Sequence, residues 1–334
     1  MHPPNPPPKS PGRTRAALLA LLIGLLPAAA TAGLVAERPE VAAFVDEMVA
    51  KHGFDRPVLV ALLDEAKIRP PVVTAAANPA EREPYHQYRK RFISEQRIAG
   101  GAAYLQEHAA LLARAETEYG VPAGLIVAIL GVETRFGNYI GKHRVLDALT
   151  TLAFSPGGRQ DFYRRELEQF LLLSREEAID PLGAMGSYAG AMGHGQFISS
   201  SYRHYAVDFD GDGRRDLWSP ADAIGSVANY FARHRWQPGE PALLTARVDG
   251  DRYRALLDRG IDPETPLTDF AGFGVTVEQP GDATRPAALL ELETEQGTRH
   301  WAALNNFRVI TRYNHSPRYA MAVHELAEAI DARR

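Results

Sequence analysis

The chain has no cysteine among its 334 residues. Disulfide bonds, thiol chemistry and thiolate metal sites are therefore excluded, and no lipid can be attached through a cysteine. Charge of one sign does not dominate either, because 37 Lys and Arg stand against 41 Asp and Glu, giving a formal net charge of −4 and a pI near 6.3. No global basic field points to nucleic acid, and we expect no nucleic-acid partner.

The hydrophobic run at the N-terminus, residues 16–26, is about eleven residues long, which is too short to span a bilayer comfortably. Lys9, Arg13 and Arg15 precede this run, and the small residues 27–32 follow it. This order is typical of a secretory signal peptide that is cleaved near Gly33, and an uncleaved anchor is the alternative. We expect export and a soluble mature protein.

Hydrophobic periodicity predicts a mainly helical chain with one small β-rich insert. The hydrophobic content of 45% and the charged content of 23% are those of a globular protein with two or three packed units. Residues 238–298 alternate between apolar and polar side chains and suggest strands. A break is expected at residues 69–73. Helices are predicted in residues 40–67, 94–119, 146–152, 162–174, 220–236 and 320–330, and in a run that starts at Pro122.

A glutamate closes the apolar helical run that starts at Pro122. At helical spacing Ile126, Ile129 and Leu130 share a face with Glu133, so its carboxylate extends a buried stripe. Partial burial raises the pKa of a carboxyl group and lets it hold a proton near neutral pH, as a general acid must. The alternative is a structural ion pair, for which the nearby candidates are Arg135, Lys142 and Arg144.

Residues 183–200 are rich in glycine and serine, which does not suit a regular helix. Met185, Tyr188, Met192 and Phe197 are interleaved with the glycines, and a solvated linker would not carry them. We therefore expect a backbone that another group approaches closely, and not a flexible linker.

Residues 208–219 (DFDGDGRRDLWS) match the first half of an EF-hand calcium loop. Side-chain oxygens stand at loop positions one, three and five, and a glycine stands at position six. At position twelve Ser219 replaces the usual glutamate, and Asp222 could supply that carboxylate from a longer loop. Magnesium is less natural here, and an acidic turn that binds nothing is the alternative. The predicted ligands are Asp208, Asp210, Asp212, Arg214 through its carbonyl oxygen, and Asp222.

Residues 311–319 (TRYNHSPRY) bring tyrosines and an amide together in a predicted loop. Such side chains could stack on a sugar and hydrogen-bond to it, and they could equally belong to a surface turn. Tyr230 lies on the predicted helix 220–236, where by itself it suits a core position better than a ligand contact.

Several segments, in order, resemble the lytic murein transglycosylases of the membrane-bound lytic transglycosylase B type, and the resemblance extends from about residue 38 to the C-terminus. These segments are 131–137 (GVETRFG), 144–149 (RVLDAL), 187–197 (SYAGAMGHGQF), 224–231 (IGSVANYF) and 310–316 (ITRYNHS) followed by Tyr319. The resemblance implies a mainly α, α+β fold: a goose-lysozyme-like helical core, an N-terminal α-domain, a small β-domain and one EF-hand-like calcium site.

With this resemblance the chain divides into five consecutive parts. Residues 1–32 are the signal peptide, 33–85 the N-terminal α-domain and 86–236 the lysozyme-like catalytic core, which includes the loop 208–222. Residues 237–305 are the small β-rich domain, and 306–334 return to the core. Residues of about 155–182 could pack with the α-domain.

The resemblance further implies cleavage of the β-1,4 bond between N-acetylmuramic acid and N-acetylglucosamine in peptidoglycan without the use of water. An ordinary glycosidase needs two carboxylates, whereas the sequence offers only Glu133, since Asp147 suits a structural role. Glu133 would act first as acid and then as base, while the substrate's N-acetyl group stabilises the cation and its C6 hydroxyl closes a 1,6-anhydro ring. The positions that match the family's glycan cleft are Tyr88, Ser187, Gln196, Phe197, Tyr230, Tyr313, Asn314 and Tyr319.

Two features depart from the family. Many relatives carry a lipid on a cysteine that this chain lacks, so a soluble periplasmic form is expected. His194 stands where relatives commonly place Tyr or Gln, which could alter contacts with the sugar or the response to pH.

The expected ligands and partners follow from the same resemblance. They are structural calcium, no organic cofactor, and peptidoglycan glycan strands, with cell-wall synthesis or division proteins as further candidates, and the protein is expected to be a monomer. The alternative functions are a lysozyme-like muramidase and a non-catalytic, calcium-stabilised peptidoglycan-binding protein.

Overall fold

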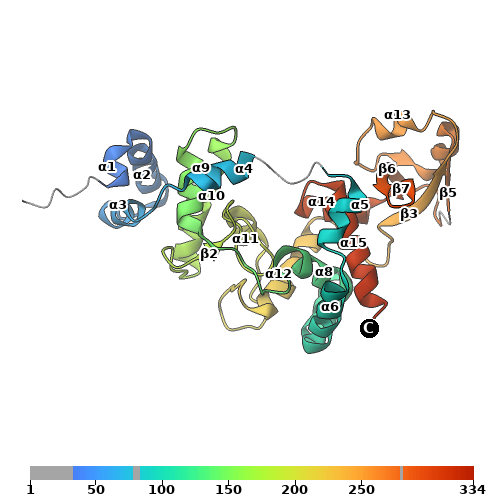
Figure 1. Cartoon of the computed structure of the whole chain (residues 1–334). Helices are drawn as coiled ribbons and strands as arrows, with labels where there is room; N and C mark the ends of the chain where they lie inside the picture. The colour runs from blue at the N-terminus through green and yellow to red at the C-terminus, as the bar shows by residue number, and fades with distance from the viewer. Residues whose placement is uncertain (1–32, 78–82, 279–280) are drawn as a thin grey trace, which may run out of the picture.

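The computed structural model describes residues 33–77, 83–278 and 281–334, so the predicted signal peptide lies outside the described residues. In Figure 1 three short helices form one end of an elongated molecule, and an antiparallel sheet forms the other end. Helix α8 (Ala123–Thr134), which carries Glu133, lies between them with the helices that pack around it. The predicted fold class, mainly helical with a small β-rich insert, is confirmed.

The N-terminal helices are α1 (Leu34–Glu37), α2 (Pro39–His52) and α3 (Arg56–Asp64). The helical pattern predicted over residues 40–67 is interrupted because Gly53 adopts the left-handed conformation, with φ 63°, and ends α2. Asp55 then caps α3 by accepting a hydrogen bond from the amide of Val58 at 3.0 Å.

The break predicted at residues 69–73 lies earlier, at residues 65–69, because Pro70 and Pro71 begin helix α4 (Pro70–Ala77). Proline is tolerated in a first helical turn, where the missing N–H would have no partner within the helix. The side chain of Val72 is fully buried, and α4 packs on α9 (Val145–Phe154), beside which it lies in Figure 1.

Helix α10 (Gln160–Glu176) packs along α9 and also contacts α2 through side chains. Glu168 lies 2.7 Å from Nε2 of His52, and Arg164 donates to Glu47 at 2.9 Å.

The single helix predicted over residues 94–119 is wrong at His108, which separates α6 (Glu95–Glu107) from α7 (Ala109–Tyr119). His108 leaves the helical conformation at φ −108° and ψ 25°, and its ring lies 4.3 Å from that of Tyr104. The buried positions Leu105 and Leu112 keep helical spacing across the break, so periodicity could not reveal it.

Helix α8 (Ala123–Thr134) is buried on almost every side, as its apolar sequence requires. Four helices pack around it: α6, α7, α12 (Pro220–Arg233) and α15 (Pro317–Asp331). Pro122 precedes the first helical residue and is the N-cap. The shorter helices of this region are α5 (Tyr85–Tyr88), α11 (Ser199–Tyr205) and α14 (Asn305–Tyr313).

The β-rich insert is a five-stranded antiparallel sheet with the order β4-β6-β7-β3-β5 and a hydrophobic cluster of its own. Its central hairpin pairs Leu290 with Trp301. The strands are β3 (Leu243–Val248), β4 (Thr265–Pro266), β5 (Val275–Val277), β6 (Pro286–Thr294) and β7 (Gly297–Ala303). A separate two-stranded sheet pairs β1 (His143–Arg144) with β2 (Met185–Gly186) and fixes the start of the glycine-rich segment.

Among the described residues, no single helix is long and apolar enough to cross a membrane. Helices α7 and α8 reach the required length and composition only when taken together, and the chain bends by 114° between them.

Candidate active site

Glu133 lies one residue before the end of α8, at the start of a strained turn. Residues 135–137 have consecutive positive φ angles of 52°, 61° and 82°, a conformation that non-glycine residues adopt at a cost. The ring of Phe136 stacks on that of Tyr104 at 5.6 Å and lies so close to Gly131 that a Cβ there would come within 2.7 Å of it. Packing of this aromatic side chain therefore fixes the turn.

Thr134 ties the end of α8 to the glycine-rich segment. Its buried hydroxyl oxygen lies 2.8 Å from the carbonyl oxygen of His194 and accepts a hydrogen bond from the amide of Gly137 at 2.9 Å. Gln196, itself at φ 51°, donates from Nε2 to the carbonyl oxygen of Ile140 at 3.1 Å. The segment is therefore ordered by contacts with the turn that follows Glu133.

The close approach predicted for the glycine-rich segment is made by the protein's own atoms. A Cβ on Gly186 would lie 2.2 Å from the carbonyl oxygen of Ala191, and one on Gly195 would lie 2.9 Å from the hydroxyl of Tyr313. Larger residues at these positions would push the segment away from its neighbours.

Glu133 accepts a hydrogen bond from the hydroxyl of Tyr319, in the first turn of α15, at 2.5 Å from Oε1. Burial raises the pKa of Glu133 to about 7, against the opposing effect of this hydrogen bond. Burial and the nearby Glu133 together raise the pKa of Tyr319 well above its usual value. Within the described parts of the chain Glu133 forms no ion pair, and Arg144 instead holds Asp147 at 2.6 Å.

A cavity of about 380 Å³ opens at Glu133, which is the one carboxylate among its lining residues. Ser187 lies in the wall of this cavity and fixes the backbone that follows it. Its hydroxyl oxygen accepts hydrogen bonds from the amides of Ala189 and Ala191 at 3.2 and 3.0 Å. The residues that line this cavity are Pro71, Ala75, Glu133, Tyr139, Gly141, Lys142, His143, Ser187, Tyr188 and Gln196.

Three of the predicted glycan-cleft residues form an aromatic cluster behind this wall. The ring of Phe197 lies 5.8 Å from those of Tyr230 and Tyr313, which are 4.9 Å apart. Both hydroxyls donate to backbone oxygens at 2.6 Å, that of Tyr313 to Gly195 and that of Tyr230 to Arg312. None of the three lines the Glu133 cavity, and the hydrogen bond from Tyr313 connects the cluster to Gly195.

The other predicted contacts lie on the α15 side of Glu133. Tyr88 is buried, with its ring 5.1 Å from that of Phe92, and its charge would raise the pKa of Tyr319. The loop predicted over residues 311–319 is much shorter in the structure, because Tyr313 ends α14 and α15 begins at Pro317. Asn314 is partly exposed in this short turn.

The acidic loop brings together three of its four predicted aspartates. Carboxylate oxygens of Asp208, Asp210 and Asp222 lie within 4.8 Å of one another. Asp222 is 1% exposed and accepts hydrogen bonds from the amides of Phe209 and Asp216, each at 2.6 Å, while burial raises its pKa. This set of hard oxygen donors fits a metal ion such as calcium.

Asp212 is not a member of this group, and its Oδ1 accepts a hydrogen bond from the amide of Arg214 at 2.8 Å. The loop also reaches the active site, because Leu217 accepts a hydrogen bond from the amide of His194 at 2.8 Å.

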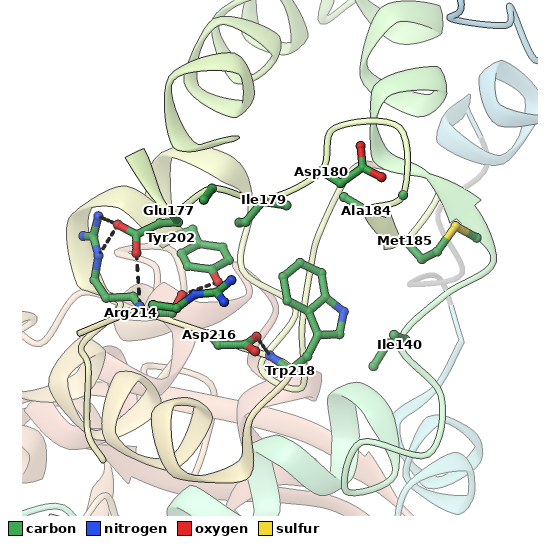
Figure 2. A pocket seen from close by; sticks show the side chains of 13 residues that line it. Ile140, Glu177, Ile179, Asp180, Ala184, Met185, Tyr202, Arg214, Asp216 and Trp218 are labelled. Carbon is green, nitrogen blue, oxygen red and sulfur yellow. Dashed lines mark hydrogen bonds and ion pairs between the residues drawn. The ribbon is translucent and has the colours of Figure 1, made fainter. Parts of the chain in front are cut away.

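A second cavity, of about 510 Å³, is lined by residues 214–216 of this loop and also by Ile140 and Met185. In Figure 2 the indole of Trp218 lies between Asp216 of the loop and the side chains of Met185 and Ile140. None of its lining residues lines the Glu133 cavity as well. Glu133 and the acidic loop therefore border different cavities.

His194 does not line the Glu133 cavity, and its effect on contacts with the sugar stays a prediction. Its ring lies 2.5 Å from where a Cβ on Gly137 would be, and burial lowers its pKa. Sequence reasoning missed the cavity positions Tyr139, Lys142 and His143. They belong to an irregular connection, where no periodicity marks which side chains face a cleft.

The mainly helical core, with one half-buried acid facing a cavity, is the architecture of the lysozyme-like glycan-cleaving enzymes. Residues 36–328 match the family model described as "Transglycosylase SLT domain", and the chain belongs to this family. The protein is a lytic murein transglycosylase that acts on peptidoglycan.

Known relatives share most of the chain. Membrane-bound lytic murein transglycosylase B of Escherichia coli (strain K12) is 43% identical over 308 residues, which are 89% of this chain and 84% of that protein. The structure of soluble lytic transglycosylase SltB1 from Pseudomonas aeruginosa has a TM-score of 0.84 at 46% identity, covering 88% of this chain and 99% of that one.

Two further solved structures contain ligands. The Escherichia coli lytic transglycosylase Slt35 in complex with calcium has a TM-score of 0.83 at 43% identity, covering 90% of this chain and 96% of that one. SltB3 from Pseudomonas aeruginosa in complex with NAG-anhNAM-pentapeptide has a TM-score of 0.77 at 33% identity, covering 87% of this chain and 78% of that one.

Proposed function

We propose that Glu133 carries both proton transfers of the reaction at the bond between N-acetylmuramic acid and N-acetylglucosamine. The protonated carboxyl group donates to the glycosidic oxygen as the bond from that oxygen to C1 breaks. The carboxylate then takes the proton of the muramic acid C6 hydroxyl, whose oxygen attacks C1 and closes the 1,6-anhydro ring. Glu133 therefore ends the reaction protonated, as it began, and no water is consumed.

The single carboxylate in the cavity is the observation that carries this proposal. A glycosidase with two catalytic carboxyl groups places them about 5 Å apart when retaining and about 6.5–9.5 Å apart when inverting, whereas Glu133 is the one acid lining its cavity. Asp147 is 2% exposed and is held by Arg144 and Arg69, so it suits a structural role. The substrate's N-acetyl group would stabilise the cation that a second carboxylate otherwise stabilises.

We assign the other predicted cleft residues to two groups. Ser187 and Gln196 line the cavity and can contact the sugar directly. Tyr313, Tyr230 and Phe197 form the aromatic cluster behind the wall and would act by positioning Gln196 and its neighbours. Tyr319 would hold the carboxylate of Glu133, while Tyr88 and Asn314 would border the cleft on the α15 side.

We further propose that calcium binds the acidic loop and stabilises the fold. Asp208, Asp210 and Asp222 would supply carboxylate oxygens, and Asp212 and the Arg214 carbonyl oxygen would complete the shell after a local adjustment. The positive charge of the bound ion would hold the loop together. The hydrogen bond from the amide of His194 to the carbonyl oxygen of Leu217 would then connect the ordered loop to the cleft.

The location that we propose is the periplasm, where the peptidoglycan substrate lies. The basic, apolar and small-residue order of residues 1–32 supports export, and these residues lie outside those that the structure describes. The chain has no cysteine to carry a lipid, which supports a form without a lipid anchor.

Digestion of purified sacculi by wild type and by Glu133→Gln tests the proposed chemistry. Wild type should release muropeptides that end in 1,6-anhydromuramic acid, each lighter by one water than the hydrolysis product in mass spectrometry. Glu133→Gln should release none while keeping the fold by circular dichroism. Reducing muramic acid ends would favour a lysozyme-like muramidase, and full activity of the variant would refute the role of Glu133.

A further inference from the structure

The cavity of about 510 Å³ beside the acidic loop is a second concave site on the catalytic core, and the reaction at Glu133 does not use it. Its volume lies within the range of about 300–1,000 Å³ that is usual for small-molecule sites. Ile140, Ile179 and Met185 give it an apolar side. The indole of Trp218 stands between this side and the acidic loop (Figure 2).

Hydrogen bonds fix the wall that carries Trp218. The hydroxyl of the fully buried Tyr202 donates to the carbonyl oxygen of Arg215 at 2.6 Å and accepts from the amide of Leu217 at 3.0 Å. Nε of Arg215 in turn donates at 2.8 Å to Glu177, the C-cap of α10. The cavity is therefore formed in advance, which lowers the cost of ordering it around a ligand.

Several polar groups of the cavity are left for a ligand. The indole N–H of Trp218 donates to no described residue, and it is not buried. Oδ1 of Asp216 accepts from the amide of Trp218, and Oδ1 of Asp180 accepts from that of Leu182, each at 2.9 Å. Within the described parts of the chain neither aspartate forms an ion pair, so the second oxygen of each can accept from a hydroxyl.

The charges that line the cavity nearly balance, which favours a neutral ligand. Glu177 and Arg215 pair with each other, and Asp180, Asp216 and Arg214 remain. The described carboxylates that can converge on one metal ion are those of the acidic loop group, and none of them lines this cavity. An aromatic surface with carboxylate acceptors and a free N–H suits a molecule that has an apolar face and a rim of hydroxyls, as a sugar has.

We propose that this cavity binds an N-acetylated glycan strand of peptidoglycan, separate from the stretch that is cleaved at Glu133. A sugar ring would stack on the indole of Trp218, and its hydroxyls would donate to Asp180 and Asp216. The methyl of an acetamido group would contact Met185. The site would hold the enzyme on the sacculus between cleavages, and this role does not depend on the proton transfers that we assign to Glu133.

Tryptophan fluorescence can detect this binding directly. The chain has three tryptophans, Trp218, Trp236 and Trp301, and none of them lines the Glu133 cavity. A neutral tetramer of N-acetylglucosamine is the probe, and Glu133→Gln is the parent protein, so that nothing is cleaved. We expect a saturable change in emission that is lost in Trp218→Phe and kept in the matched control Trp301→Phe.

Asp180→Asn tests the cavity without touching the fluorophore. It keeps an oxygen that can accept from the amide of Leu182 but removes the charge that would strengthen a bond from the sugar. It should raise the Kd reported by Trp218 about threefold. No response in the parent, a response that persists in Trp218→Phe, or an unchanged Kd in Asp180→Asn would overturn the proposal.

Two substrates separate this site from the catalytic cleft. A soluble glycan tetrasaccharide is cleaved after binding at Glu133 alone, whereas a sacculus presents further strands that the second site can hold. With Glu133 intact, Trp218→Ala should lower kcat/KM on sacculi about tenfold and leave kcat/KM on the tetrasaccharide unchanged. Trp301→Ala, in the β-rich insert, should change neither value. Equal losses on both substrates, or no loss on sacculi, would show that the cavity does not hold a second strand.

Discussion

The hydroxyl of Tyr319 donates a hydrogen bond to Oε1 of Glu133 at 2.5 Å, across 186 positions of sequence. Burial favours the protonated carboxyl group and raises its pKa, whereas this hydrogen bond favours the carboxylate and lowers it. The balance leaves a pKa of about 7. An acid near that value can give up a proton and take it back within one catalytic cycle.

Removal of this hydroxyl should move the pH profile. Tyr319→Phe removes the hydrogen bond that stabilises the carboxylate, so the pKa of Glu133 should rise further, by about one to two units if the bond contributes about 1.5–3 kcal/mol. The alkaline limb of kcat/KM against pH should move upward by that amount, and kcat should fall.

Tyr104→Phe is the control for this prediction, because it removes a buried hydroxyl that has no hydrogen-bond partner among the described residues. Its pH profile should match that of wild type. An alkaline limb that stays in place in Tyr319→Phe would show that the hydrogen bond does not set the pKa of Glu133.

Glu133 should also make stability depend on pH. Its pKa in the folded state is about 7, raised from 4.5, so the folded state binds the proton more tightly than the unfolded state does. The stabilisation that comes from the protonated form is complete at acid pH and is lost as pH rises from about 4.5 through 7.

Glu133→Gln should therefore be more stable than wild type at pH 8, by up to about 3 kcal/mol, and of equal stability at pH 4. Chemical denaturation at the two pH values measures this difference. Glu264→Gln, at an exposed position, should give no such trend. A Glu133→Gln variant that is no more stable at pH 8 than wild type would contradict the raised pKa.

Calcium should raise the melting temperature of metal-stripped protein, because an ion that binds only the folded state stabilises it by mass action. Asp210→Asn should reduce this increase and change the metal-free melting temperature little, since Asp210 is exposed. Asp222→Asn should lower both values, because Asp222 also accepts two backbone hydrogen bonds. An unchanged melting temperature on adding calcium to wild type would argue against the site.

Thr134→Val should destabilise the protein by about 1–3 kcal/mol, because it leaves the amide of Gly137 without its acceptor and frees the carbonyl oxygen of His194. Activity should fall as well, since the segment that carries Gln196 loses a contact with α8. Thr117→Val, at an exposed site whose hydroxyl bonds only within its own helix, should cost less than about 0.5 kcal/mol. Comparable losses in the two variants by urea denaturation would show that the link to His194 is not important.

Features that depend on neighbours in sequence were predictable. The apolar run before Glu133 predicted a buried helix that ends in a carboxylate, and α8 confirms it. The alternation in residues 287–293 predicted a strand, and β6 confirms it. The acidic loop was recognisable from the spacing of its aspartates, whose role as metal ligands stays a prediction. Side-chain periodicity and turn chemistry are local properties, so the sequence displays them directly.

Other features arise only when distant segments pack together. The sequence did not show that His108 divides a helix, that Pro70 begins one, or that Lys142 lines the cavity at Glu133. It also left open whether Glu133 forms an ion pair, and in the structure its partner is Tyr319. By itself the sequence determined the mainly helical character of the chain, the β-rich insert and the position of the acidic loop. The tertiary structure decided what surrounds the carboxylate of Glu133, and because desolvation and hydrogen bonding set a pKa, it also decided the chemistry available to that carboxylate.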